Sequence, residues 1–394
     1  MEVYLDNSAT TKVSKEVMDL MTKVSCEDYG NPSSKHSMGM RAEQYIKKAT
    51  EVIATNLKVH PREIFFTSGG TEANNLALVG AAFANNRRGN HIITTRIEHP
   101  SVQEPVLFLE NCGFKIDFAP VDRTGKLIEE KLYQLINEDT ILISIMYVNN
   151  EIGSVQDIDK IISEIRKIKR NVIIHVDATQ AIGKYYIYPE REGIDLLTFS
   201  GHKIHGPKGI GALYVHRRVK INPLVYGGGQ QRGFRPGTEN VPAIAGLGLA
   251  IQEAYDNFTE KREKLYKLKQ YFFRQVSKLD DVKINGIAKE CENFEMEYIK
   301  KTAPHIMSVS FEGVRSEVLL HALEDKGIYV SSGSACSSNS PESSATLTGI
   351  GLSTNQIDST IRFSMSNWTT KEEIDYTIEQ LNVLLPFLRR YRRR

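Results

Sequence analysis

Apolar residues occur in two patterns in the first half of the chain, as continuous runs and at helical spacing. Between about residues 60 and 215, short continuous apolar runs alternate with longer segments of helical spacing, such as 157–170, where isoleucines recur on one face. Continuous apolar runs are typical of strands buried in a mostly parallel sheet. The predicted strands are Ile64–Thr67, His91–Thr95, Lys115–Ala119, Ile141–Val148, Val172–Asp177, Ile194–Ser200 and Ala212–Val215. This pattern predicts an α/β fold with a doubly wound sheet.

A different pattern begins near residue 259. A long helix is predicted over Thr259–Leu279, followed by short strands and a final helix that begins with the capping box Thr370 and Glu373. The short strands are predicted near Ile306–Phe311, Ile328–Val330 and Ile361–Ser364, and the final helix would bury Ile374, Ile378, Leu381 and Leu385. We therefore expect a large domain over residues 15–258. Residues 1–14 and 259–394 would form a smaller α+β domain with a mobile loop at about 331–345.

Composition and charge exclude several classes of protein. The 394 residues suit about two domains, and 41% apolar with 25% charged residues is ordinary for a globular protein. A net charge of +2 argues against a dedicated nucleic-acid binder, and no apolar run reaches the length of a membrane span. No secretory signal is visible, and the four cysteines are scattered, so a cytoplasmic location without disulfides is expected. The arginine-rich end, 389–394, is interpreted as solvated, with an acidic partner or RNA as the alternative.

The most informative motif is Ser200-Gly201-His202-Lys203, which follows an apolar strand. A lysine at the end of a buried strand is partly desolvated, which lowers its pKa and makes its amine a nucleophile and proton carrier. Such an amine can bind a carbonyl cofactor as a Schiff base, and pyridoxal 5′-phosphate (PLP) is the usual one. The alternative is a surface lysine in a Gly/Pro turn.

Two further segments suit the phosphate and the ring of PLP. The turn around Gly70 and Thr71 would place backbone N–H groups and a hydroxyl at a helix N-terminus, where one phosphate fits. Asp177 ends an apolar strand, and a buried carboxylate there could pair with a protonated pyridine nitrogen, with Gln180 reaching the ring's phenolic oxygen. The alternatives are a capped helix start at the first segment and a helix N-cap at Asp177.

Two more polar segments follow predicted strands. His99 could stack on a flat cofactor and shuttle protons, and Asn150 lies in a turn after another strand. A structural loop histidine and turn-forming asparagines are the alternatives. All five segments lie at carboxyl ends of strands, the edge at which ligands bind in open α/β sheets. Together they predict a PLP site, with Thr71, Ser200 and His202 on the phosphate.

The second domain adds a nucleophile and a cation. Cys336 lies in a run of small polar residues, which is the composition of a mobile loop. A thiol there can act as a nucleophile that moves with the loop. Arg362, on an apolar strand, would clamp a substrate carboxylate. The alternatives are an incidental surface cysteine and a structural ion pair. No resident metal site is expected, and Cys336 is the one candidate for transient ligation of a metal or cluster.

These motifs together resemble one family. The segments YLDNSATT, GGTEANN, IEHPS, NNEIGS, HVDATQ, SGHKIHGPKG, RPGTEN and SSGSAC occur in order from residue 4, and the chain resembles cysteine desulfurases of the NifS/IscS type to about residue 380. These belong to the class V aminotransferases, with the PLP-dependent aspartate-aminotransferase-like (type I) fold, a mostly parallel seven-stranded sheet and a smaller domain.

The resemblance implies a role for each motif residue. Lys203 would form the Schiff base, His99 would stack on the ring as acid and base, and Cys336 would take the sulfur of L-cysteine. The other implied cofactor residues are Gly70, Thr71, Asp177, Gln180, Ser200 and His202, with Thr238 reaching the phosphate of the neighbouring subunit in a homodimer. Asn150 and Arg362 would bind the substrate. The SSGSAC segment and the long loop after it resemble the branch with a long cysteine loop.

The implied function is conversion of L-cysteine to L-alanine, with sulfur passed as a persulfide to an acceptor protein. The chain departs from the family beyond Cys336 and in its arginine-rich end, where housekeeping members carry an extension that binds the iron–sulfur scaffold. The acceptor therefore stays open between a scaffold, a tRNA-thiolating enzyme and a dedicated partner. Alternatives are a selenocysteine lyase or aminotransferase, a non-catalytic sulfur carrier and an RNA-binding module.

Overall fold

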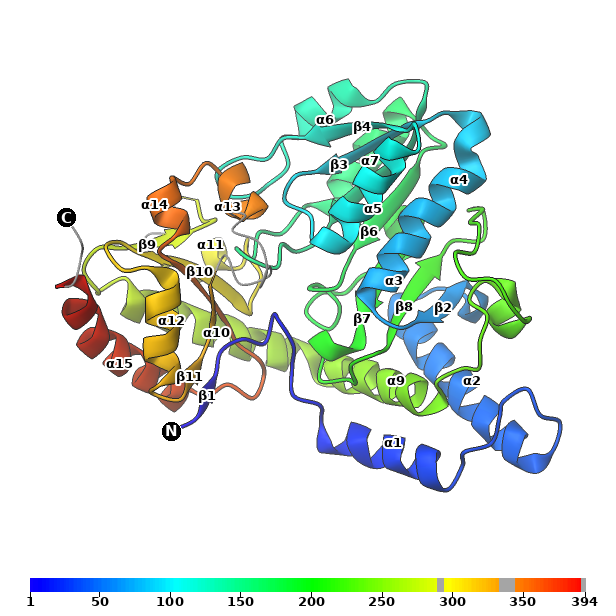
Figure 1. Ribbon diagram of the computed structural model, residues 1–394, viewed down its shortest axis with the longest axis horizontal. Helices are drawn as coiled ribbons and strands as arrows, with labels where there is room; N and C mark the ends of the chain where they lie inside the picture. Colours follow the sequence, from blue (N-terminus) through cyan, green and yellow to red (C-terminus); the bar gives the residue numbers. More distant parts are fainter. Residues whose placement is uncertain (289–293, 333–343, 391–394) are drawn as a thin grey trace.

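The computed structural model describes residues 1–288, 294–332 and 344–390. Figure 1 shows two bodies, a large domain built on a seven-stranded sheet and a small domain built on a four-stranded sheet. The large sheet has the order β2-β8-β7-β6-β5-β3-β4, and β8 alone is antiparallel to its neighbours within it. Its strands are β2 (Ile64–Thr67), β3 (His91–Thr95), β4 (Lys115–Ala119), β5 (Thr140–Met146), β6 (Ile173–Asp177), β7 (Leu196–Ser200) and β8 (Gly211–Val215).

The predicted mostly parallel sheet is confirmed, although several strand ends differ by one or two residues: β5 ends at Met146 rather than Val148, β6 begins at Ile173 and β8 begins at Gly211. β7 begins at Leu196 rather than Ile194, and just before it the Asp195 carboxylate takes up a backbone N–H of β6 beside the backbone bond from Asp195 N–H to the Ile174 carbonyl oxygen. Asp195 Oδ2 accepts the backbone N–H of Ile174 at 2.9 Å and an ion pair from Arg166 at 2.6 Å, while Oδ1 is paired with Arg218 at 2.7 Å. A buried carboxylate with three such partners is satisfied, so this aspartate anchors the sheet at the end remote from the predicted site.

Helices cover both faces of the large sheet, which gives the predicted α/β layering. One face packs against the helical run α3 (Gly70–Asn75), a π-helical segment (Leu76–Gly80) and α4 (Ala81–Asn85), together with α5 (Pro100–Asn111). The other face packs against α1 (Lys15–Cys26), α2 (Ser37–Leu57), α7 (Ile158–Ile168) and α9 (Val241–Tyr255). The remaining helices of this part are α6 (Glu129–Leu135) and α8 (Pro189–Glu192).

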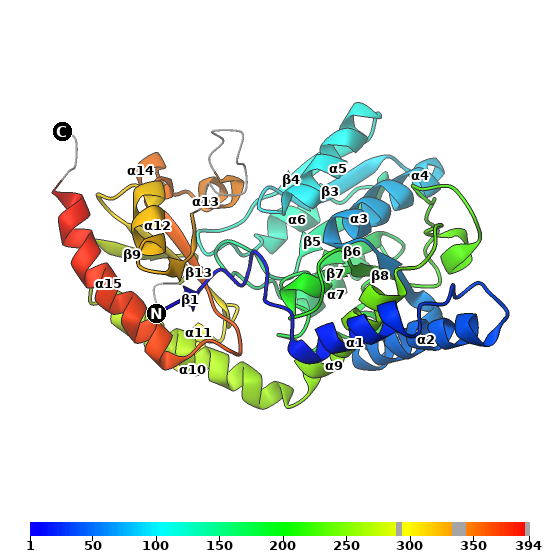
Figure 2. The ribbon, with the colours of Figure 1, turned by 60° about the horizontal axis from the view of Figure 1, so that its bottom comes forward.

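The small domain is an antiparallel sheet of order β12-β13-β10-β9 with its own core. Its strands are β9 (Val282–Asn285), β10 (Ile306–Phe311), β12 (Ser331–Ser332) and β13 (Thr360–Ser364). The helices are α10 (Phe258–Val276), α11 (Met296–Ile299), α12 (Ser316–Glu324), α13 (Ala345–Gly349), α14 (Thr354–Ile357) and α15 (Lys371–Arg389). Figures 1 and 2 show α10 leading from the large domain into this body, where α15 lies beside it.

Both ends of the chain belong to the small domain. At the N-terminus, β1 (Val3–Tyr4) pairs in parallel with β11 (Ile328–Tyr329). At the C-terminus, the capping box of Thr370 and Glu373 on α15 is present, as predicted, although Ile378 is only partly buried. Arg389 donates to the carbonyl oxygens of Glu312 at 3.0 Å and Asp280 at 2.7 Å, so the arginine-rich end starts from an anchored helix. The domain limits at residues 14 and 258 stay a prediction.

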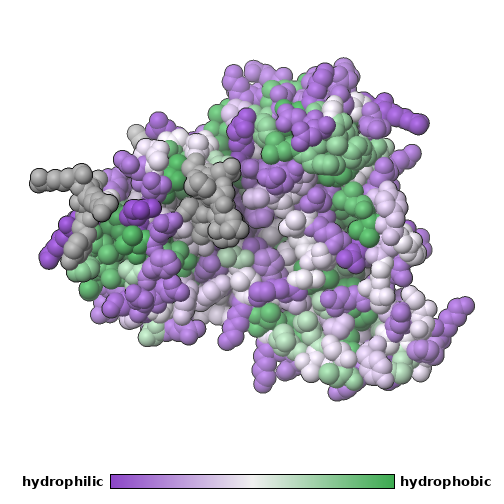
Figure 3. Space-filling model, in the orientation of Figure 1, coloured by the Kyte–Doolittle hydropathy of each residue, from purple (hydrophilic) through white to green (hydrophobic). Residues whose placement is uncertain are grey.

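Hydrophilic residues dominate the face in Figure 3, with the apolar ones gathered in separate patches. Within the described ranges, every helix is too short or too polar to cross a bilayer.

Candidate active site

A cavity of about 580 Å³ opens at the carboxyl ends of the parallel strands, between the large sheet and the small domain. Its size is that of a site for a small organic ligand. Ten of the residues singled out in the sequence line it: Gly70, Thr71, His99, Asn150, Asp177, Gln180, Ser200, His202, Lys203 and Arg362. The fold therefore brings together side chains that are up to 292 positions apart, because parallel strands end at one edge.

The Asp177 carboxylate lies at the end of β6 and is 5% exposed. Its Oδ2 accepts a hydrogen bond from Asn74 Nδ2 at 2.8 Å, and its Oδ1 accepts the backbone N–H of Thr179 at 2.9 Å. The second bond is the local capping contact of the alternative interpretation, but it closes a turn and not a helix. Asn74 also donates to Ser101 Oγ at 2.9 Å, which links Asp177 to the segment that carries His99.

His99 caps the N-terminus of α5, and its ring is held from one side. Its Nδ1 accepts the backbone N–H of Ser101 at 3.1 Å and lies 2.8 Å from Ser101 Oγ. Burial lowers the pKa of His99 below its usual value, and the cations Lys203 and Arg362 add to this, although Asp177 opposes it. The ring is therefore neutral at neutral pH with its proton on Nε2, ready to give or take a proton.

The sequence interpretation missed Asn74 and Ser101, which join the two predicted residues. Asn74 is fully buried and lies four residues after Gly70 on the same helical run. Residues at that spacing share one face of a helix. If Gly70 faces a phosphate at the edge of the sheet, Asn74 is expected to face the same edge. The four-residue spacing between Gly70 and Asn74 is the sequence signal that could have identified Asn74.

One end of the cavity has the features of an anion cradle. Gly70 and Thr71 begin the helical run 70–85, and a Cβ at Gly70 would lie 3.2 Å from Thr179 Oγ1, so a side chain there would narrow this end. Ser200 and His202 come from the end of β7 and the turn after it. Burial lowers the pKa of His202 to about 4, so its ring is neutral and offers a hydrogen bond without a charge.

Lys203 lies in a 3₁₀ turn (Gly201–Lys203) directly after β7. Its Nζ donates to the carbonyl oxygens of Ser8 at 2.6 Å and Ala9 at 2.8 Å. Lys184 Nζ in turn donates to the carbonyl oxygen of Lys203 at 2.7 Å. Burial, with Lys203 nearby, lowers the pKa of Lys184 to about 7. The N-terminal segment is therefore part of this wall, which periodicity alone did not indicate.

Arg362 enters the cavity from β13 of the small domain and is 6% exposed. It forms an ion pair with Asp6 at 2.9 Å and donates to Ser331 Oγ at 2.9 Å and to the carbonyl oxygen of Asn150 at 3.1 Å. The structural ion pair offered as the alternative interpretation is thus present. Its Nε is buried and has no partner in the described part of the chain, so the guanidinium keeps a donor for a ligand.

One predicted residue, Thr238, does not line this cavity, and another, Cys336, cannot be placed. Thr238 is exposed, and its predicted role stays a prediction. Cys336 lies outside the described residues, as do Cys291 and most of the predicted cysteine loop. The other two cysteines, Cys26 and Cys112, are exposed and free.

The residues present fit PLP. Lys203 Nζ, a buried carboxylate at Asp177 and a neutral imidazole at His99 face one cavity, and the anion cradle forms one end of it. Two buried polar atoms of lining residues, Ser8 Oγ and Arg362 Nε, have no partner among the described residues. Unpaired buried polar atoms are costly, so their presence suits a polar ligand.

Comparison with known proteins gives a consistent result. Residues 3–377 match the family model "Aminotransferase class-V". The chain is 42% identical over 389 residues to a protein named cysteine desulfurase IscS from Dictyoglomus turgidum, covering 98% of this chain and 95% of that one.

Two solved structures agree with this. A NifS-like protein superposes with a TM-score of 0.90 at 38% identity over 98% of this chain and all of that one. A structure described as SspA in complex with cysteine has a TM-score of 0.79 at 33% identity, covering 94% and 100% of the two chains. The chain therefore belongs to the class V aminotransferases and, within them, to the cysteine desulfurases of the NifS/IscS type.

Proposed function

We propose that this cysteine desulfurase uses PLP to convert L-cysteine to L-alanine and keeps the sulfur as a persulfide on Cys336. An acceptor protein, serving iron–sulfur cluster assembly or tRNA thiolation, then receives the sulfur. The observation that carries the proposal is the meeting of Asp177, His99 and Lys203 at one cavity, with Arg362 contributed by the small domain. An amine, a buried carboxylate and a neutral imidazole are the set that this chemistry needs.

When bound, PLP supplies an electron sink that makes the bonds at the α-carbon of an amino acid labile. Asp177 would pair with the ring nitrogen, and Asn74 would hold that carboxylate in place. Lys203 Nζ would hold the cofactor and then take the proton from the substrate α-carbon. His99, neutral because it is buried, would stack on the ring and move protons at its Nε2. Gly70, Thr71, Ser200 and His202 would hold the phosphate.

The substrate would be bound by residues from both domains. Arg362 would bind the carboxylate of cysteine through its remaining N–H groups, and Asn150 lies beside it. The related SspA structure is described as holding cysteine, which supports the same substrate here.

The sulfur transfer conserves atoms and electrons. The thiolate of Cys336 attacks the substrate sulfur, the carbon–sulfur bond breaks, and its electron pair returns to carbon, which takes up a proton to give alanine. Cys336 keeps the transferred sulfur as a persulfide, which a thiol of the acceptor protein can then take.

A homodimer is part of the proposal. Leu224, Val225 and Tyr226 are 39%, 51% and 82% exposed, and they precede the exposed Thr238 in the same segment. Three consecutive exposed apolar residues are unusual on a monomer surface and suit a subunit interface. Such an interface would let Thr238 reach the phosphate of the partner's cofactor.

The decisive experiment uses the full chain reconstituted with PLP and supplied with L-cysteine. We expect equal amounts of alanine and, with a thiol reductant, sulfide. Formation of a keto acid in place of alanine would indicate an aminotransferase and overturn the proposal. Parallel reactions with L-selenocysteine would identify a lyase, for which selenide release would far exceed sulfide release.

Replacing Arg362 by glutamine tests the substrate contact. We expect kcat/KM for cysteine to fall by about 10- to 100-fold, mainly through KM, because hydrogen bonds between charged groups are lost. Asp6→Asn is the matched control, since it breaks the same ion pair but keeps the guanidinium. If both variants change KM equally, Arg362 acts only as a structural partner of Asp6.

A further inference from the structure

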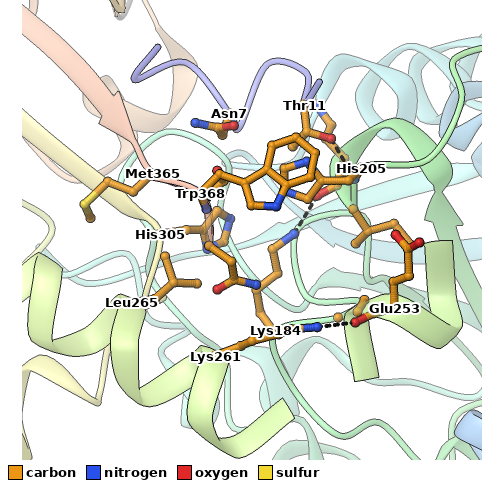
Figure 4. Close-up of a pocket in the computed structure, with 16 residues that line it drawn as sticks. Asn7, Thr11, Lys184, His205, Glu253, Lys261, Leu265, His305, Met365 and Trp368 are labelled. Carbon is orange, nitrogen blue, oxygen red and sulfur yellow. Dashed lines mark hydrogen bonds between the residues drawn. The ribbon is translucent and has the colours of Figure 1, made fainter. Parts of the chain in front are cut away.

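A second, smaller cavity lies behind Lys203 at the junction of the two domains. This rear cavity has a volume of about 100 Å³ and is lined by residues that include Lys184, Lys203, His205, His305 and Trp368 (Figure 4). Lys203 also lines the active-site cavity, so the two spaces share a wall. The rings of His205 and Trp368 are in contact, with centroids 3.8 Å apart and planes tilted by 36°.

His305 spans this wall from the small domain to the large one. Its Nε2 lies 3.1 Å from Gln180 Oε1, and Gln180 Nε2 donates to the carbonyl oxygen of Ser8 at 2.9 Å. The same carbonyl oxygen accepts from Lys203 Nζ at 2.6 Å. A backbone carbonyl can only accept, so the Gln180 amide must present its NH₂ group to Ser8 and its oxygen to His305.

The amide orientation determines the tautomer of His305. Since Gln180 Oε1 accepts, the hydrogen of the neutral imidazole is on Nε2 and Nδ1 carries a lone pair. His305 Nδ1 is buried and has no partner in the described ranges. Because the residue lines the rear cavity, a water molecule there could donate to Nδ1.

We propose that His305 is a positioning residue: it holds the oxygen of the Gln180 amide and so keeps the NH₂ group directed at Ser8 and the active-site cavity. The proposal rests on the proposed function and on the role expected for Gln180 from the sequence, in which its remaining N–H would reach the phenolic oxygen of PLP. A donor at that oxygen stabilises its charged form, so the position of His305 would influence the titration of the bound cofactor.

The surroundings of His305 keep it in the neutral form that this role needs. It is 2% exposed, and burial lowers its pKa well below the usual value. Four cationic groups from different elements lower its pKa further: Lys184 after β6, Lys269 on α10, Lys203 after β7 and Arg362 on β13. A second proton on the ring is therefore disfavoured at any pH near neutrality.

The hydrogen bond between His305 and Gln180 also connects the small domain to the proposed cofactor site. The backbone N–H of Met365 donates to the carbonyl oxygen of His305 at 2.8 Å, which ties His305 to the chain just after β13. Ser8 is tied there as well, because its N–H donates to Ser364 Oγ at 2.8 Å. Both ends of the Gln180 amide thus rest on groups that β13 holds, and a shift of the small domain would move them together.

The test is a pH titration of the absorbance of the PLP-loaded enzyme. In His305→Leu we expect the midpoint to rise by about 0.5 to 1 pH unit, because the Gln180 donor is no longer held. His305→Gln can donate from a side-chain amide and should return the midpoint toward that of the unaltered protein. Gln180→Leu removes the donor and should raise the midpoint by the full amount. The double variant Gln180→Leu/His305→Leu should then have the same midpoint as Gln180→Leu alone.

The outcomes separate this proposal from the proposed function. If the unaltered protein binds PLP and titrates, but His305→Leu titrates identically or shifts the midpoint additively with Gln180→Leu, the positioning role is wrong. If the unaltered protein shows no Lys203-dependent absorbance, the proposed function itself fails.

A measurement without cofactor covers the case in which His305→Leu does not fold. Nitrogen-15 NMR of the unaltered protein should show the His305 ring as the Nε2–H tautomer at pH 7 to 8. An Nδ1–H tautomer or a charged ring would overturn the proposal.

Discussion

Lys203→Ala is expected to abolish the visible absorbance of the PLP-loaded protein and to lower alanine formation from L-cysteine by about 10³-fold or more. The amine is both the proposed attachment point and the proposed base at the α-carbon, so a single truncation removes two functions. Its loss also removes the hydrogen bonds from Nζ to the carbonyl oxygens of Ser8 and Ala9, although Ser8 still accepts from Gln180 Nε2. Absorbance spectra and an alanine assay measure the two effects separately.

Lys208→Ala is the matched control, because this exposed lysine lies five residues further along the same loop. It should keep both the spectrum and the activity. Retention of the absorbance band in Lys203→Ala would mean that another amine holds the cofactor, and Lys184, whose Nζ contacts the Lys203 backbone, would be the first to examine.

Cys336→Ser is expected to leave the absorbance of the bound cofactor unchanged and to lower sulfide release by at least about 100-fold, because a hydroxyl does not replace a thiolate as a nucleophile toward sulfur. Mass spectrometry of the unaltered protein after a single turnover should show one added sulfur on the peptide that contains Cys336. The variant should lack that addition.

Cys26→Ser and Cys112→Ser are the controls, since both cysteines are exposed and free and could also pick up sulfur non-specifically. Neither change should affect the rate. Undiminished sulfide release by Cys336→Ser would remove this residue from the mechanism while leaving the cofactor roles of Lys203 and Asp177 in place.

The fold could be predicted from the sequence because strand and helix patterns depend on residues that are close in the chain. The apolar strands from Ile64 to Val215 and the helical spacing between them depend only on neighbours within each segment, and the structure confirms the sheet that they predict. The start of β7 was predicted two residues too early, at a point where the Asp195 side chain accepts the backbone N–H of Ile174. That side chain is also paired with Arg166 and Arg218, which no local pattern relates to Asp195.

The hydrogen-bond partners of the site residues were harder to predict from the sequence. Motifs identified Lys203, Asp177 and His99 as chemical groups, but not Asn74 or Ser101, whose hydrogen bonds join two of them. The N-terminal segment was recognised as a family motif without a role. In the structure, Asp6 pairs with Arg362 and Ser8 accepts from Lys203, 195 positions away in the chain.

By itself, the sequence determined the α/β class, the order of the strands along the chain and the chemical identity of the site residues, because periodicity and short motifs are properties of contiguous residues. The tertiary structure alone decided which of those residues meet. It placed Arg362 against Asp6, bridged Asp177 to Ser101 through Asn74, and brought His305 to Gln180 across the domain junction. Hydrogen bonds and burial act over a few ångströms in space whatever the separation in sequence, so these pairings arise only once the two domains pack.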